Sequence, residues 1–188
     1  MAAALAVPLP ASAETGDARA LQIVREYSRA FMSADVETLT KLAHPVLALR
    51  IGGEQRYRAF LQHQFETFRE QDLGLKDGVE LLGVPSETFV DGGTRMLGVP
   101  AVRKSRGIGT VGHVYVAVSY DAGLSWKVLS LMCTDTHWLK ALAPGYKDKP
   151  DILGIADPSI AATVGTDRFD EATFLRGPRA GTATGIGR

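Results

Sequence analysis

The chain has a single cysteine, Cys133, among its 188 residues. One cysteine excludes an intrachain disulfide, and it also excludes a zinc site built from several thiolates. Cys133 lies in an apolar run, which is typical of a buried structural thiol rather than a nucleophile. We expect neither a bound metal nor a cofactor.

An excess of charge of either sign is also missing. Lysine plus arginine and aspartate plus glutamate each number 21, so no bulk charge favours nucleic acid or an acidic partner. No apolar run of the sequence is long enough to cross a bilayer. With 188 residues, 45% of them apolar, the chain is expected to form one globular domain.

The first 13 residues have features of an export signal. They read MAAALAVPLPASA, and Ala11-Ser12-Ala13 has the small-x-small form that signal peptidases cut. We therefore predict that residues 1–13 are removed and that the protein is periplasmic or secreted. A disordered cytoplasmic N-terminus is the alternative.

Three amphipathic segments predict helices in the first part of the chain. Residues 18–32 form the first, with Asp17 as N-cap and Tyr27 on the apolar side. A short helix is expected at 36–43. The clearest helical pattern runs over 54–71, where aromatic residues recur at helical spacing and are expected to pack the helix onto a sheet.

Short β-rich runs predict a sheet. The first strand is expected at residues 46–51, and alternation indicates two more at 79–89 and 94–103, joined by a turn at 91–93. Pro85 interrupts the earlier of these two, which favours an edge position or a bulge.

A long antiparallel hairpin is expected from residues 110–120 and 125–134. Its bend reads SYDAGLSW at 119–126 and resembles an Asp-box, the turn motif of sialidase-type propellers. Asp121 can accept hydrogen bonds from the turn, and Gly123 can take a positive φ. The motif occurs once, and a propeller needs several blades, so a stabilised turn is favoured over a carbohydrate or metal site.

Residues 146–188 differ in composition from the rest. Proline and glycine recur, and the last residues are rich in glycine, alanine and threonine. We interpret this segment as an irregular C-terminal appendage of a domain that spans residues 14–145.

The order of these elements resembles the nuclear-transport-factor-two-like superfamily, which includes SnoaL-like and ketosteroid-isomerase-like proteins. Residues 23–42, IVREYSRAFMSADVETLTKL, are similar to its opening segment, and the resemblance covers about residues 17–144. It implies an α+β fold in which a bent antiparallel sheet wraps the N-terminal helices as a cone with an internal pocket.

A comparison with ketosteroid isomerase argues against that reaction. Tyr27 matches the tyrosine that donates to the substrate oxygen in that family. Arg50 and Ile51 stand where the resemblance places the general-base aspartate, and no aspartate occurs near residues 114–117 for the second donor. An isomerase of that type is therefore not expected.

The pocket residues that we predict are Tyr27, Arg50, His113 and Tyr115. His113 and Tyr115 share one face of their strand, and Tyr27 lies on the helix that this face would cover. Arg50 is expected at the rim. We place no carboxylate beside His113, so we expect a neutral imidazole. Asp135, with His113 and Tyr27, completes the set of catalytic candidates.

These residues favour an exported domain that binds a small apolar or amphipathic ligand, with no assigned reaction. One alternative is a lyase or hydrolase that uses His113 with Tyr27. Another is an interaction module that forms a homodimer through the outer sheet face. The direction of the His113 side chain distinguishes them.

Overall fold

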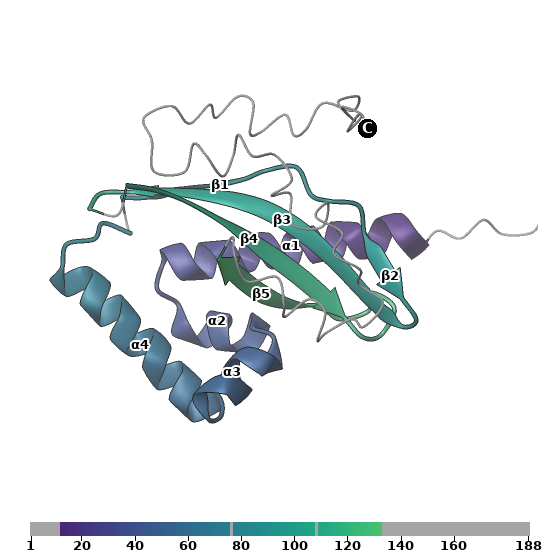
Figure 1. Cartoon of the computed structure of the whole chain (residues 1–188), viewed down its shortest axis with the longest axis horizontal. Coiled ribbons are helices and arrows are strands. Elements are labelled where there is room, and N and C mark those ends of the chain that lie inside the picture. The colour runs from purple at the N-terminus through teal and green to yellow at the C-terminus, as the bar shows by residue number, and fades with distance from the viewer. Residues whose placement is uncertain (1–11, 76, 108, 133–188) are drawn as a thin grey trace, which may run out of the picture.

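The computed structural model describes residues 12–75, 77–107 and 109–132, in which four helices precede an antiparallel sheet (Figure 1). The predicted α+β class is confirmed. The helices are α1 (Ser12–Met32), α2 (Val36–Leu42), α3 (Pro45–Ile51) and α4 (Glu54–Glu70). The strands are β1 (Val79–Leu82), β2 (Phe89–Asp91), β3 (Thr94–Ser105), β4 (Gly109–Ser119) and β5 (Lys127–Met132).

The sheet has the strand order β1-β3-β4-β5, and β2 also pairs with β3. The longest pairing joins β3 to β4, from Arg95 opposite Ser119 to Ser105 opposite Gly109. The predicted hairpin is confirmed as the antiparallel pair β4–β5. Leu82 pairs with Ala101, and the interruption expected at Pro85 separates β1 from β2.

Helix α1 covers one face of the sheet (Figure 1). Its Tyr27 contacts Tyr115 of β4 edge to face, with the ring centroids 5.7 Å apart. The sequence predicted that helix α4 packs on the sheet. This prediction is wrong, because the main contacts of α4 are with other helices. It packs on α2 and α3, and its Phe65 meets Phe31 of α1 at 5.2 Å, because α1 already occupies the sheet.

The segment predicted as the first strand is helix α3. His44 is its N-cap, and Nδ1 accepts a hydrogen bond from the Val46 N–H at 3.2 Å. Pro45 takes the first helical position, where its missing N–H costs no hydrogen bond. Gly52, with φ +93°, ends the helix in the left-handed conformation. A seven-residue apolar run cannot distinguish strand from helix by periodicity, so the flanking caps decide.

The N-cap assigned to Asp17 is also wrong. Helix α1 already begins at Ser12, so Asp17 lies inside it. Its carboxylate accepts a hydrogen bond from Arg95 Nη2 at 3.0 Å, which joins the helix to β3.

Strand β4 carries apolar side chains on both faces of the sheet, because alternation directs successive residues to opposite faces. Tyr115 and Ala117 of β4 belong to the core between sheet and helices. Val114, Val116 and Val118 point to the opposite face, and their exposed fractions are 1% or less. The opposite face is therefore also shielded from water.

Candidate functional site

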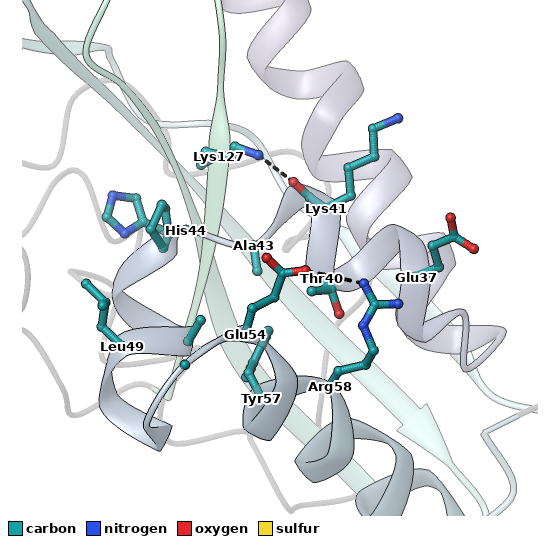
Figure 2. Close-up of a pocket in the computed structure, with 13 residues that line it drawn as sticks. Glu37, Thr40, Lys41, Ala43, His44, Leu49, Glu54, Tyr57, Arg58 and Lys127 are labelled. Atoms are coloured by element: carbon teal, nitrogen blue, oxygen red, sulfur yellow. Dashed lines mark hydrogen bonds and ion pairs between the residues drawn. The ribbon is translucent and has the colours of Figure 1, made fainter.

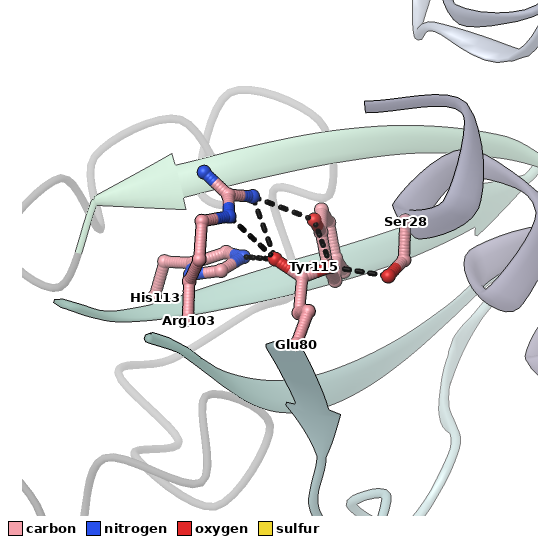
Figure 3. A network of polar contacts seen from close by, with 5 residues as sticks. All are labelled: Ser28, Glu80, Arg103, His113 and Tyr115. Atoms are coloured by element: carbon pink, nitrogen blue, oxygen red, sulfur yellow. Dashed lines mark hydrogen bonds and ion pairs between the residues drawn. The ribbon is translucent and has the colours of Figure 1, made fainter. Parts of the chain in front are cut away.

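Five polar side chains form a buried network on the helix-covered face of the sheet (Figure 3). They come from four elements. Ser28 lies on α1, Glu80 on β1, Arg103 on β3, and His113 and Tyr115 on β4. The sheet register brings them together, because Glu80 is opposite Arg103, and Ala101, two residues before Arg103, is opposite His113.

The Glu80 carboxylate is the centre of this network, and its side chain is 2% exposed. Oε1 accepts hydrogen bonds from Arg103 Nε at 3.0 Å and from Arg103 Nη2 at 2.6 Å. Oε2 accepts one from the Tyr115 hydroxyl at 2.8 Å and another from the Ser28 hydroxyl. Both oxygens therefore have donors, as a buried charge requires.

His113 points inward, and its side chain is 4% exposed. Nε2 lies 3.2 Å from Glu80 Oε1, although the approach lacks the alignment of a hydrogen bond. The imidazole also meets the Tyr115 ring edge to face at 4.8 Å. The expectation that no carboxylate lies beside His113 is therefore wrong. Glu80 and Arg103 lie in two strands that the sequence predicted, but their shared face depends on the register of β1 on β3, which alternation alone does not give.

The charge state of Glu80 follows from opposing effects. Burial raises its pKa, but the contact with His113 and the charge of Arg103 lower the pKa by more than burial raises it. The resulting pKa is about 2. Glu80 is therefore ionised at neutral pH and is too weak a base to remove a proton efficiently.

Tyr115 of this network and the neighbouring Tyr27 remain protonated. Burial is the main cause that raises the pKa of Tyr115 well above its ordinary value, and Glu80 adds to it. Burial also raises the pKa of Tyr27, and the neighbouring Tyr57 adds to this shift through its charge and a hydrogen bond. The hydrogen bond between the Tyr27 and Tyr57 hydroxyls links the network to α4.

The structure thus brings together three of the predicted site residues, Tyr27, His113 and Tyr115, in one buried cluster. Arg50 is not part of it and lies on the exposed side of α3. Asp135 lies outside the described residues, as do the predicted appendage and residues 1–11.

A cavity of about 650 Å³ lies beside this cluster, between α2, α3, the start of α4 and the start of β5 (Figure 2). Tyr57 lines it and is only 5% exposed, so this residue connects the cavity with Tyr27. The side chains of Tyr27, His113 and Tyr115 do not line this cavity. Sequence reasoning missed its location because α3, which forms one wall, was predicted as a strand.

Charged groups gather on one side of the cavity. The Lys127 ammonium donates to the backbone carbonyl of Lys41 at the end of α2. Arg58 pairs with Glu54 at 3.4 Å, and their side chains are 42% and 70% exposed. With Glu37, the described residues of the lining hold three cations and two carboxylates, which leaves one positive charge in excess among them.

His44 is another lining residue of the cavity. Its Nε2 is 2.9 Å from the Tyr120 hydroxyl, and its Nδ1 caps α3. Burial, and then the charge of Lys127, lower the pKa of His44. The imidazole is therefore neutral at pH 7 and contributes no charge to the cavity.

The Asp-box-like turn uses its carboxylate internally. Asp121 accepts hydrogen bonds from the Ser125 N–H at 2.8 Å, the Ser125 hydroxyl at 2.6 Å and the Ser119 hydroxyl at 2.7 Å. Gly123 has φ +98°, and its carbonyl accepts from Trp126 Nε1 at 3.0 Å. The hydrogen bonds with Ser125 and then Ser119 lower the pKa of Asp121 to about 2. These contacts agree with a structural turn.

Among residues 12–75, 77–107 and 109–132, no group of three His, Cys, Asp or Glu side chains could hold a metal ion. No helix of these residues is long and apolar enough to span a membrane.

No family model, curated protein or solved structure matches the chain significantly. The resemblance to nuclear-transport-factor-two-like proteins therefore stays a prediction.

Proposed function

We propose that this chain is a small-molecule-binding domain whose ligand occupies the cavity between α2, α3, α4 and β5. The observation that carries the proposal is the cavity itself, with its volume of about 650 Å³. Small-molecule sites commonly have volumes of about 300–1,000 Å³. The ligand is amphipathic and carries an anionic group.

The two kinds of wall support an amphipathic ligand. Leu49 is 73% exposed although it is a large apolar residue, and it lines the cavity with Ala48 and Pro45. An apolar chain that covers this wall would remove it from water. Lys41 and Lys127 carry the positive charge that is in excess, so the anionic head group of the ligand is favoured at the end of the cavity that these two lysines line.

The buried network supports the cavity from behind. Tyr57 is held by Tyr27, Tyr27 packs on Tyr115, and Tyr115 donates to Glu80. Side chains fixed in this way lose little further freedom when a ligand binds, so the wall is preorganised.

The contact between Glu80 and His113 is the observation that favours the alternative of a lyase or hydrolase. Both oxygens of Glu80 are occupied by donors, its pKa is about 2, and His113 is almost fully buried. A network with these properties acts as an anchor between α1 and the sheet, so we propose binding without a reaction.

The assignment to the nuclear-transport-factor-two-like fold is part of the proposal. A helix on the inner face of an antiparallel sheet supports it, whereas α3 departs from the expected strand. A homodimer through the opposite sheet face is not part of it, because the valines of that face are buried.

Octanoate and octanol test the ligand class. We expect octanoate to bind saturably in isothermal titration and octanol to bind more weakly. Lys127→Met should weaken octanoate about tenfold without the same effect on octanol, because it removes the ammonium next to the proposed head group. Lys104→Met is the matched control, since Lys104 is on β3 and does not line this cavity. Equal loss in both variants would contradict the assigned position of the head group.

An occlusion experiment tests the cavity directly. Ala48→Phe introduces a ring into the cavity wall and should abolish octanoate binding. Ala59→Phe makes the same change on the exposed side of α4, outside the lining, and should bind like the wild type. Unchanged binding by a folded Ala48→Phe variant would exclude this cavity as the site.

Export remains a proposal based on the sequence motif alone. N-terminal sequencing of the protein from its native host is expected to begin at Glu14. Intact Met1 in protein from the cytoplasm would disprove it.

A further inference from the structure

A second hollow, of about 440 Å³, lies between the C-terminal ends of α1 and α4, the loop after α4 and Arg106. We propose that it is a separate binding site for a small, uncharged aromatic molecule. The proposal does not depend on the ligand of the first cavity, because none of the described residues lines both hollows.

Aromatic rings form the base of this hollow. Phe65 and Phe68 of α4 both line it, and their rings meet edge to face with centroids 6.3 Å apart. Phe31 extends the group behind them, 5.2 Å from Phe65. Rings packed edge to face accept a further ring in the same geometry, so an aromatic ligand gains more here than an aliphatic one.

The walls next to these rings are apolar as well. Met32 from the end of α1 and Val36 from the start of α2 form one side, and Leu73 and Leu75 from the loop form the other. Leu75 is nearly buried, whereas the other three are partly exposed. The methionine thioether adapts its shape and makes favourable contacts with ring edges, which suits a flat ligand.

Charges of both signs at the rim of this hollow favour an uncharged ligand. Arg106 and Asp72 face each other at 2.8 Å, so each offsets the other. The other charged groups among the described lining residues are Arg69, Glu66 and Asp77. These described residues provide no excess of cations for an anionic head, in contrast to those of the first cavity.

The base of the hollow is also held in place from the core. The Arg103 guanidinium lies over the Phe31 ring, 3.9 Å from its centroid, and the same guanidinium is bound to Glu80. The Phe31 ring is therefore fixed by a cation–π contact, and Phe65 packs on a fixed surface.

The site is tested with phenylnaphthylamine, an uncharged aromatic fluorophore whose emission rises in apolar surroundings. We expect saturable binding to the wild type. Phe68→Leu removes one ring of the base and should weaken binding about threefold to tenfold. Phe60→Leu is the matched control, because Phe60 is on the same helix, is 47% exposed and does not line the hollow. Its affinity should stay within about twofold of the wild type.

A local probe keeps the test valid if Phe68→Leu does not fold. The ε-methyl resonance of Met32 in the wild type should shift on titration with the fluorophore, because Met32 lines the hollow. The methyl resonance of Met96, which is buried on the opposite face of the sheet, should stay unchanged. Binding that leaves Met32 unmoved, equal affinities of the two leucine variants, or no saturable binding would each overturn the proposal.

Discussion

Replacing Glu80 by glutamine tests whether the buried network anchors α1 to the sheet. The side chain keeps its shape but loses its charge. Arg103, whose side chain is 15% exposed, then has no anion to pair with in the network. Removing one partner of a buried ion pair typically costs about 3–5 kcal/mol of unfolding free energy. We expect a loss in that range for Glu80→Gln at pH 7, measured by urea unfolding.

The pH dependence gives a second measure of the same interaction. The pKa of Glu80 falls from an ordinary 4.5 to about 2 in the folded protein. Because this folded pKa is depressed, the stabilisation is complete above about pH 5 and is lost as the pH falls towards 2. This difference in pKa corresponds to a stabilisation of the folded state by about 3 kcal/mol, which agrees with the cost expected from the lost ion pair. The stability difference between wild type and Glu80→Gln should therefore shrink over this range.

Glu87→Gln is the control, because Glu87 is exposed and lies outside the network. It should change stability by less than about 0.5 kcal/mol. If Glu80→Gln matched this control at pH 7, or if its deficit did not depend on pH, the carboxylate would not be an ionic anchor.

Three smaller perturbations have defined outcomes. Asp121→Ala should lower the melting temperature, since the turn loses its hydrogen-bond acceptor. The difference in melting temperature between wild type and variant should fade as the pH drops from about 4 towards 2, because the pKa of Asp121 is about 2. An unchanged melting temperature at pH 7 would contradict this. His44→Ala removes the cap of α3 and should cost about 1 kcal/mol in urea unfolding. Because the pKa of His44 is lowered in the fold, its stabilisation is present above pH 6.5 and declines as the pH falls, so the wild type should lose more stability from pH 7 to 5 than the variant. Tyr27→Phe should cost about 1 kcal/mol by leaving the Tyr57 hydroxyl without its partner, and equal stability would show that this hydrogen bond is dispensable.

The sequence by itself determined the elements whose signals are local. Helical spacing over 54–71 predicted α4 to within a residue at its end, and the turn residues predicted the β4–β5 hairpin. Alternation along β4 placed His113 and Tyr115 on one face, and both are buried there with Tyr27. Periods of two and of 3.6 residues are properties of the chain itself, so they can be read without a structure.

Only the tertiary structure decided the contacts between distant segments. Glu80 and His113 are separated by 33 positions, and they meet because β1 and β4 both pair with β3. The identity of α3 depended on its caps, since its short apolar run suits a strand equally well. Both cavities are bounded by ends of helices whose relative placement follows from packing. A buried carboxylate is stable only where several donors converge on it, and that convergence is a property of the fold rather than of any one stretch of sequence.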